Sequence, residues 1–341
     1  MNKSNGDLAQ TPAPDRPVFL HAPAGSIAPR VRVGGLPLLE RLLREQARAG
    51  FTRAVVACDR QELAPDVPIP VEWVAPGSPP PDGMPAIPAN VIRGIEVRDE
   101  ASRRRAEWAL VSGMNKSFQG PIDALVNCHF SFRITRALCN TRVMPNHITI
   151  AGIFLVAVAL GFAAWGGWLA AAIAGVLLQL HSILDSCDGE LARLRYQGSR
   201  LGQWLDNLSD DFGDDLFVAC IGIGLGGPWL WLGLAGALGR ALHQTYSYVT
   251  VYRATGTGDL YHFRWWFEAA KTSMDEVYDR RSLLTWLRAL GRRDTYVFLW
   301  MLFCVAGFAE GVVVYGLALA AIFDTMTAID VVAKARRRAD D

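Results

Sequence analysis

Four aspartates near the middle of the chain have the type and spacing needed to bind divalent metal ions. They form two pairs, Asp185 with Asp188 and Asp206 with Asp210. Spacings of three and four residues place each pair on one face of a helix. Converging carboxylates repel one another unless cations neutralise them, and their oxygens suit hard cations such as magnesium, manganese or calcium. The sequence therefore predicts a site for two divalent cations, an arrangement suited to in-line displacement at phosphorus.

Small and basic residues beside the aspartates favour a phosphate ligand. Gly189 and Gly202 allow close approach of a ligand or of another backbone. Ala192 is also small, and Arg193 supplies a planar cation suited to phosphate. A solvated acidic helix end is the simpler alternative, but it explains neither the matched spacings nor the glycines. Together these residues predict a site for a diphosphate and its metals.

Apolar segments provide the elements that position this site. An apolar helix of about 20 residues can cross a bilayer. The sequence predicts six membrane spans, at residues 148–165, 168–184, 201–225, 228–251, 295–308 and 312–332. The first aspartate pair ends the second span and the other pair begins the third. Because a short loop joins these spans, they are expected to be antiparallel neighbours whose carboxylates converge.

Basic residues predict the orientation of the spans. The turns at 166–167, 226–227 and 309–311 contain no Lys or Arg, whereas the opposite side is rich in both. Since cytoplasmic loops carry the excess of Lys and Arg, both termini and the aspartates are expected to face the cytoplasm. A soluble helical protein with long core helices is the alternative, and the one-sided basic loops argue against it.

Two further segments mix apolar or aromatic residues with charge. Residues 123–140 and 261–267 are expected to lie along the membrane surface, where amphipathic side chains are favoured. Packed soluble helices are the alternative for both segments.

Composition limits the remaining classes. The chain has 341 residues and a net charge of +1, so no global field favours nucleic acid. Its six cysteines lack metal-ligand spacing and are interpreted as free thiols. Residues 1–17 are polar and do not resemble a secretory signal, so the first domain is expected to remain in the cytoplasm.

The aspartate region resembles the CDP-alcohol phosphotransferase (CDP-alcohol phosphatidyltransferase) family. The family pattern is DxxDGxxAR, eight residues, then GxxxDxxxD, and every defined position is present between Asp185 and Asp210. The segment from Thr141 to Thr149 is similar to the family's TxxTPNxIT, with Met144 in place of a common threonine. The resemblance covers about residues 115–338.

The resemblance assigns roles to individual residues. It implies that two divalent cations, Mg²⁺ or Mn²⁺, are held by Asp185, Asp188, Asp206 and Asp210, with Asp210 as general base. The CDP moiety would be surrounded by Gly189, Ala192, Arg193 and Gly202. The cytidine end would lie near Pro145, Asn146 and Thr149.

The acceptor side departs from common members of the family. Asp211 stands where many members carry arginine, and Asp214 adds a further acid. Ordinary membrane anchoring would explain nearby arginines equally well. The candidates to bind a charged acceptor are Arg253, Arg292, Arg293 and Asp294.

The N-terminal part is expected to be a small α/β unit. An apolar strand at 17–21, an amphipathic helix at 36–50 and a second strand at 52–59 alternate along the chain. The helix and its flanks resemble the first unit of sugar-phosphate nucleotidyltransferases, but glycines are too sparse for a phosphate loop. We expect a degenerate, non-catalytic remnant. The expected division is a cytoplasmic α/β domain at 1–110 and a six-helix membrane domain at 111–341, with a proline-rich linker or surface loop at 76–88.

The predicted protein is therefore a mainly α membrane protein with six transmembrane helices and a small cytoplasmic α/β N-terminal domain. Its expected reaction transfers a phosphoalcohol group, with CDP-diacylglycerol the commonest donor in the family, to a hydroxyl acceptor such as inositol phosphate or a similar polyol, and releases CMP. A homodimer in the cytoplasmic membrane is expected from the resemblance. An aspartate-rich membrane prenyltransferase and a divalent-cation transporter remain the alternatives.

Overall fold

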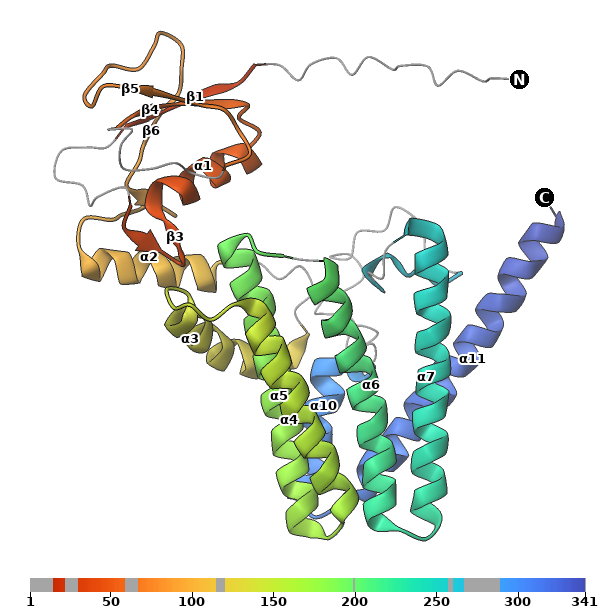
Figure 1. Ribbon diagram of the computed structural model, residues 1–341. Helices are drawn as coiled ribbons and strands as arrows, with labels where there is room; N and C mark the ends of the chain where they lie inside the picture. Colours follow the sequence, from red (N-terminus) through yellow and green to blue (C-terminus); the bar gives the residue numbers. More distant parts are fainter. Residues whose placement is uncertain are drawn as a thin grey trace. The chain divides into compact units, whose positions relative to one another are not determined.

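The chain divides into two compact units in the computed structural model. One contains residues 1–114 with 139–141, and the other contains residues 115–138 with 142–341. The structure describes residues 15–21, 30–58, 67–114, 120–198, 200–256, 260–266 and 289–340 (Figure 1).

A four-stranded parallel sheet forms the first unit, in the order β5-β4-β1-β6. Its strands are β1 (Pro17–His21), β4 (Arg53–Ala57), β5 (Val71–Val74) and β6 (Ala86–Pro88). The central strands β1 and β4 are continuous apolar runs, as expected where parallel strands are covered on both faces. Helix α1 (Leu38–Arg48) follows β1 and contributes four fully or nearly fully buried leucines to the core.

Two small hairpins and a second helix complete the first unit. The hairpins are β2 (Arg32–Val33) with β3 (Leu36–Pro37), and β7 (Val91–Ile92) with β8 (Ile95–Glu96). The first hairpin turns at two glycines with positive φ, and the buried Arg41 donates to the carbonyls of Val33 and Gly34. Helix α2 (Glu100–Ser112) begins with a capping box between Asp99 and Ser102. The expected α/β character of this part is confirmed.

Long helices form the second unit (Figure 1). They are α4 (Pro145–Trp165), α5 (Trp168–Arg195), α6 (Arg200–Leu225), α7 (Pro228–Thr255), α10 (Arg293–Val305) and α11 (Glu310–Asp340). Helix α5 packs against α4 and α10, α6 packs against α4 and α7, and α11 packs against α7. The predicted apolar segments lie within these helices except for 295–308, which extends past the end of α10 at Val305. The second segment was predicted to end near residue 184, but the helix continues to Arg195, so the first aspartate pair lies inside α5.

Glycines form the tight reversals between successive helices. Gly166 and Gly167 join α4 to α5, and Gly226 and Gly227 join α6 to α7, all with positive φ. At Gly166 a side chain is excluded twice, because the φ is +84° and an added Cβ would lie 2.4 Å from the carbonyl oxygen of Gly224. Because these two-glycine turns are so short, the helices that each turn connects run antiparallel and pack against each other.

A short helix that precedes α4 in the sequence packs against α5. It begins with one π-helical turn, η2 (Asp123–Asn127), and continues as α3 (Cys128–Leu138). The buried Glu190 of α5 accepts hydrogen bonds from Ser131 and Thr135 of α3, each 2.7 Å long. The short turn η3 (Leu260–His262) packs on α7. Residue 267, the last of the second predicted interfacial segment, lies outside the described residues.

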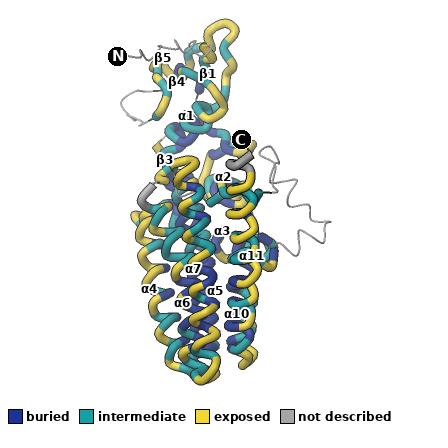
Figure 2. Tube along the Cα trace, turned by 90° about the vertical axis from the view of Figure 1, so that its right-hand side faces the viewer, coloured by how far each residue is buried: buried dark blue, intermediate teal, exposed yellow. Residues whose placement is uncertain are grey.

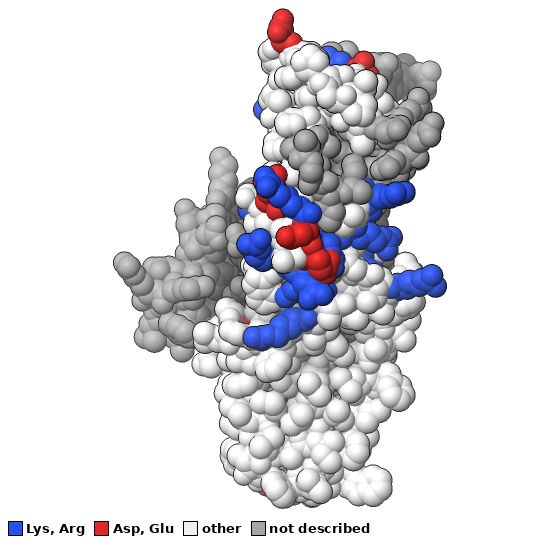
Figure 3. All heavy atoms as spheres, turned by 90° about the vertical axis from the view of Figure 1, so that its left-hand side faces the viewer, with Lys and Arg blue, Asp and Glu red and all other residues white. Residues whose placement is uncertain are grey.

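The surface of the helical unit is apolar over much of its length. Within the described part of the chain, three helices are long and apolar enough to cross a membrane: Pro145–Trp165, Trp168–Arg195 and Glu310–Arg336. Exposed residues follow the outward faces of the helices while buried ones face their neighbours (Figure 2). The end of this unit away from the aspartates shows almost no charged atoms in Figure 3. These features indicate an integral membrane protein that is mostly helical.

The structure joins none of the six cysteines, all of which lie among the described residues, in a disulfide bond.

Candidate metal centre

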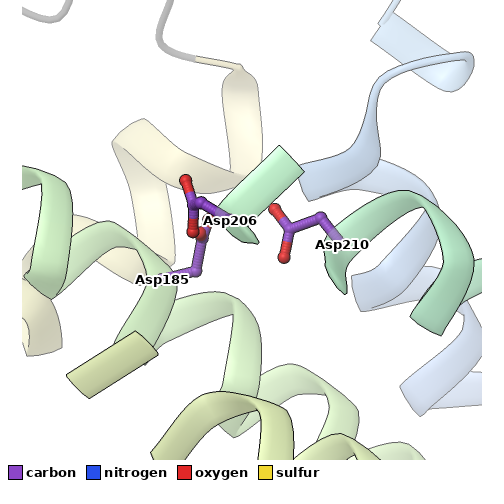
Figure 4. Close-up of side chains that lie close together, drawn as sticks. All are labelled: Asp185, Asp206 and Asp210. Atoms are coloured by element: carbon purple, nitrogen blue, oxygen red, sulfur yellow. The ribbon is translucent and has the colours of Figure 1, made fainter. Parts of the chain in front are cut away.

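Three of the four predicted metal-binding aspartates come together between α5 and α6. One carboxylate oxygen from each lies within 4.8 Å of the others, and the three residues are Asp185, Asp206 and Asp210. Their side chains point towards one another from the two facing helices (Figure 4). Helices α5 and α6 both pack against α4 and make few contacts with each other, so they are not the closely packed neighbours that the sequence predicted. Their carboxylates nevertheless converge.

Asp188 lies next to this trio but its carboxylate has another partner. It is 5% exposed, and its Oδ2 accepts a hydrogen bond of 2.6 Å from the hydroxyl of Thr149 on α4. Thr149 was predicted near the cytidine end of a donor. The structure thus connects the start of α4 to the aspartate pair of α5.

Arg293, at the start of α10, extends into the carboxylate cluster. Its Nη1 lies 2.8 Å from Asp210 Oδ2 and 3.3 Å from Asp185 Oδ2. Its Nε lies 3.0 Å from Asp214 Oδ2. The guanidinium therefore neutralises part of the negative charge, and Nη1 occupies a place between two carboxylates where a cation would be favoured.

His181 is a site residue that sequence reasoning missed. Its ring is buried, and Nε2 lies 3.0 Å from Oδ1 of Asp210. The sequence did contain a signal, because His181, Asp185 and Asp188 share one helical face through spacings of four and three. The spacing of the carboxylates by itself does not indicate a histidine at this face.

The acids that follow Asp210 on α6 have individual partners. Asp211 accepts from the Tyr248 hydroxyl, and Asp214 accepts from Tyr296 at 2.7 Å. Asp215 pairs with the buried Arg240 at 2.7 Å. Arg240 also donates to the Tyr296 hydroxyl at 3.1 Å and lies over the rings of Tyr296 and Trp300. These three acids belong to a polar network inside the bundle.

The residues that were predicted to contact the nucleotide lie at the same end of the bundle as the aspartates. They differ in how far they are buried. The guanidinium of Arg193 lies over Gly189, where an added Cβ would meet Nη1 at 3.4 Å. Ala192 and Gly202 are half-buried. Pro145 is buried as the first residue of α4, whereas Asn146 beside it is exposed.

The acceptor candidates separate into different roles. Asp294 is 6% exposed, and its Oδ2 accepts from the backbone N–H groups of Ile122 and Asp123, at 3.0 and 3.2 Å. Asp294 therefore caps the N-terminus of the continuous helix formed by η2 and α3. Arg292 forms an ion pair with Asp294 at 3.3 Å. Arg253 is exposed at the end of α7. Of the candidates, Arg293 alone contacts the aspartate trio within the described residues.

The donor set fits a divalent cation. Asp185, Asp206 and Asp210 supply carboxylate oxygens, which are the ligands that magnesium and manganese prefer. Partly buried carboxylates this close together repel strongly, and one guanidinium does not balance three of them. The structure supports a metal-binding cluster at this place.

Comparisons with known proteins agree with the site. Residues 142–274 match the family model described as CDP-alcohol phosphatidyltransferase. A protein named bifunctional IPC transferase and DIPP synthase, from Archaeoglobus fulgidus, is 38% identical over 141 residues, covering 40% of this chain and 28% of that protein. A protein of the same name from Thermococcus kodakarensis is 30% identical over 231 residues, covering 66% and 47%. The archaetidylinositol phosphate synthase of Pyrococcus horikoshii is 35% identical over 100 residues, covering 29% and 50%. The chain thus spans no more than half the length of these three curated relatives.

Proposed function

Residues 142–274 belong to the CDP-alcohol phosphatidyltransferase family, and from this premise we propose that the chain transfers a phosphoalcohol group from a CDP-linked donor to a hydroxyl acceptor. The observation that carries the proposal is the convergence of Asp185, Asp206 and Asp210 within the complete family pattern. The reaction releases CMP.

The proposed metal ligands are the four aspartates of the pattern, binding two Mg²⁺ or Mn²⁺ ions. When bound, the metals would stabilise the negative charge of the donor diphosphate. Asp188 would join the trio by exchanging its hydrogen bond from Thr149 for a metal ligand bond. The Asp188–Thr149 contact supports this, because it keeps the carboxylate beside the cluster rather than in solvent.

Asp210 is the proposed general base. The acceptor oxygen attacks the phosphorus that bears the donor alcohol, and the bond from that phosphorus to the oxygen of CMP breaks. The hydroxyl proton passes to the Asp210 carboxylate, and CMP leaves with the electron pair of the broken bond. A base within hydrogen-bond reach of the reacting hydroxyl contributes about 10²–10⁴-fold to such a step.

The CDP moiety is proposed to lie against the small residues of the pattern. Gly189 and Gly202 leave room for the diphosphate, and Arg193 above Gly189 would supply a charge-assisted hydrogen bond to it. Ala192 lies on the same side of α5. Pro145, Asn146 and Thr149 at the start of α4 are proposed for the cytidine end.

The acceptor is proposed to be an inositol phosphate or a similar polyol phosphate. The support is the printed names of the relatives, one of which is an archaetidylinositol phosphate synthase, together with Arg293 beside the cluster. A CDP-diacylglycerol-type lipid donor is proposed, which makes the reaction a step of phospholipid synthesis.

The membrane arrangement is proposed to contain six spans, α4 to α7, α10 and α11, with both termini and the carboxylates on the cytoplasmic side. The positive-inside rule supports this orientation, because Arg193, Arg195 and Arg253 lie on the side of the carboxylates while the glycine turns lack basic residues. A homodimer remains a proposal from the family. The α/β unit, proposed as residues 1–110, is proposed to be a nucleotidyltransferase remnant without catalysis.

The test is a CMP-release assay on the full chain in detergent. CDP-diacylglycerol, Mg²⁺ and a panel of polyols and polyol phosphates are supplied, with Asp210→Asn as the inactive variant. Asp324→Asn is the matched control, since Asp324 is an acid of α11 outside the cluster. Acceptor-dependent CMP that is lost with chelator and in Asp210→Asn is expected. Metal binding without CMP from any CDP donor would instead favour a prenyl diphosphate substrate or ion transport.

A further inference from the structure

We propose that His181 is a positioning residue for Asp210, to which it donates a hydrogen bond that fixes the carboxylate for metal binding and proton transfer. The inference rests on the proposed function, because it concerns the carboxylate assigned there as metal ligand and base.

The geometry places His181 directly behind Asp210. The ring belongs to α5, one turn before Asp185, and is 3% exposed. Its Nε2 lies 3.0 Å from Asp210 Oδ1, whereas Oδ2 of the same carboxylate faces Arg293 Nη1 at 2.8 Å. The two oxygens of Asp210 are thus distinguished, one facing a histidine within the bundle and the other facing the cluster.

The surroundings of the ring assign its proton. Nδ1 is buried and has no hydrogen-bond partner among the residues that the structure describes. It lies against Gly152 of α4, where an added Cβ would meet it at 3.0 Å. Since Nδ1 lacks a partner in either tautomer, the group that faces Nε2 decides between them. An ionised Asp210 carboxylate only accepts hydrogen bonds, so a proton on Nδ1 would leave two lone pairs facing each other at 3.0 Å. The neutral ring consequently carries its proton on Nε2, pointing at the carboxylate.

A hydrogen bond from His181 to Oδ1 of Asp210 would fix the orientation of the Asp210 carboxylate. Carboxylates that bind metals are generally held by hydrogen bonds from neighbouring groups, and loss of such a partner costs about 10–100-fold in metal affinity or activity. With His181 in place, rotation of the Asp210 carboxylate about its terminal bond is restricted, and Oδ2 remains directed at Arg293 Nη1, which also contacts Asp185. Without it, Asp210 would lose this orientation while the rest of the bundle is unchanged.

His243 provides a contrast within the same bundle. It also packs inside the helical unit, between the rings of Phe323 and Trp265, and contacts the hydroxyl of Thr327 at 2.9 Å. No motif aspartate contacts it within the described residues. Replacing His243 therefore measures what the loss of a packed histidine costs without disturbing the carboxylate cluster.

The experiment measures Mn²⁺ binding by calorimetry on the full chain in detergent, comparing wild type with His181→Leu, His181→Gln and His243→Leu. We expect His181→Leu to weaken Mn²⁺ binding by about 10–100-fold. His181→Gln, whose side-chain amide can donate from nearly the same place, is expected to recover most of that loss. His243→Leu is expected to leave the affinity unchanged. In the CMP-release assay, His181→Leu should lower kcat and raise the metal concentration needed for half activity, with the KM for the CDP donor unchanged.

Unchanged Mn²⁺ affinity in His181→Leu, or a glutamine variant as weak as the leucine variant, would overturn the inference and leave the proposed function standing. Absence of Mn²⁺ binding by the wild-type protein would overturn the proposed function itself. If His181→Leu does not fold, Gly152→Ala decides, because its methyl group would shift the ring by a few tenths of an ångström without removing it. A weakened Mn²⁺ affinity in that variant supports the inference, and an unchanged affinity contradicts it.

Discussion

Helix α6 carries two groups of acids that differ in how their charge is balanced. Asp206 and Asp210 face Asp185 in the cluster, with Arg293 as the nearby cation. Asp211, Asp214 and Asp215, immediately after them, have tyrosine or arginine partners from α7 and α10. In the first group three carboxylates share one guanidinium, whereas each acid of the second group has a tyrosine or arginine partner of its own. An acid-rich helix can therefore contain a metal site and a structural network side by side, and the partners distinguish them.

The largest effect is expected from Asp210→Asn. The amide cannot accept a proton as a base and is a poor ligand for a hard cation, so CMP release should fall by about 10²–10⁴-fold. The comparison predicts that Asp211→Asn lowers activity far less, because Asp211 contacts Tyr248 rather than the trio. If Asp210→Asn and Asp211→Asn lowered kcat equally, the two groups of acids would not differ in function.

Arg240→Met is expected to affect stability rather than metal binding. It leaves Asp215 buried without its cation, and breaking a buried ion pair in this way costs about 3–5 kcal/mol. The expected result is a lower thermal midpoint in detergent with little change in Mn²⁺ affinity. Adding Asp215→Leu should recover part of the lost stability, because the unpaired charge is then removed. A strong loss of Mn²⁺ affinity in Arg240→Met would show that the network and the metal site are a single unit.

Metal addition should stabilise the protein through the first group only. A ligand present at a hundred times its Kd adds about 2.7 kcal/mol to the free energy of unfolding. Mn²⁺ should therefore raise the thermal midpoint of the wild type, and chelator should reverse the shift. Asp206→Asn is expected to abolish most of the shift, and Asp215→Asn to preserve it. A shift that survives in Asp206→Asn would place the metal elsewhere.

The smallest expected effect concerns Arg293, which belongs partly to both groups. Its Nη1 must give up contacts with Asp185 and Asp210 when a cation binds between them. Arg293 and these two aspartates are mostly buried, with 14–23% of each side chain exposed. Because a bound cation would take over the charge balance that Arg293 supplies, Arg293→Gln should tighten Mn²⁺ binding by about fivefold, or about 1 kcal/mol, and should lower stability in chelator. Arg293→Lys retains the charge and is the matched control. Weaker Mn²⁺ binding in the glutamine variant would mean that Arg293 supports the metal site rather than competing with it.

The sequence predicted the elements of this site more completely than its contacts. The spacing of Asp185, Asp206 and Asp210 and the apolar segments around them predicted that carboxylates of two helices converge, as Asp185, Asp206 and Asp210 do. They did not predict that α5 and α6 are held together mainly through α4. The same reasoning placed the boundaries of most helices within a few residues. Helix α5 extends further than hydropathy suggested because its last turns are polar yet packed against α3.

Contacts from distant segments could not be predicted in the same way. Arg293 is 83 residues beyond Asp210 in the chain, and no local pattern indicates which aspartate it reaches. Asp294 was considered as an acceptor ligand, but its carboxylate caps a helix that begins more than 170 residues earlier. A single sequence reports periodicity and local chemistry, whereas such pairings depend on how the helices pack.

That cap also has a consequence for how the protein is made. The acceptor of the Ile122 and Asp123 N–H groups is a side chain synthesised long after them, and Gly120 leaves the space it occupies, since an added Cβ would lie 2.0 Å from Asp294 Oδ2. During translation, the start of the α3 helix therefore has no carboxylate cap until α10 has been added. A chain truncated before residue 289 should be cut by protease near residue 120 more readily than the full chain. Docking of α3 onto the bundle is thus expected to be a late step in biogenesis. In an incomplete chain the start of this helix would remain uncapped and accessible to the proteases of cellular quality control.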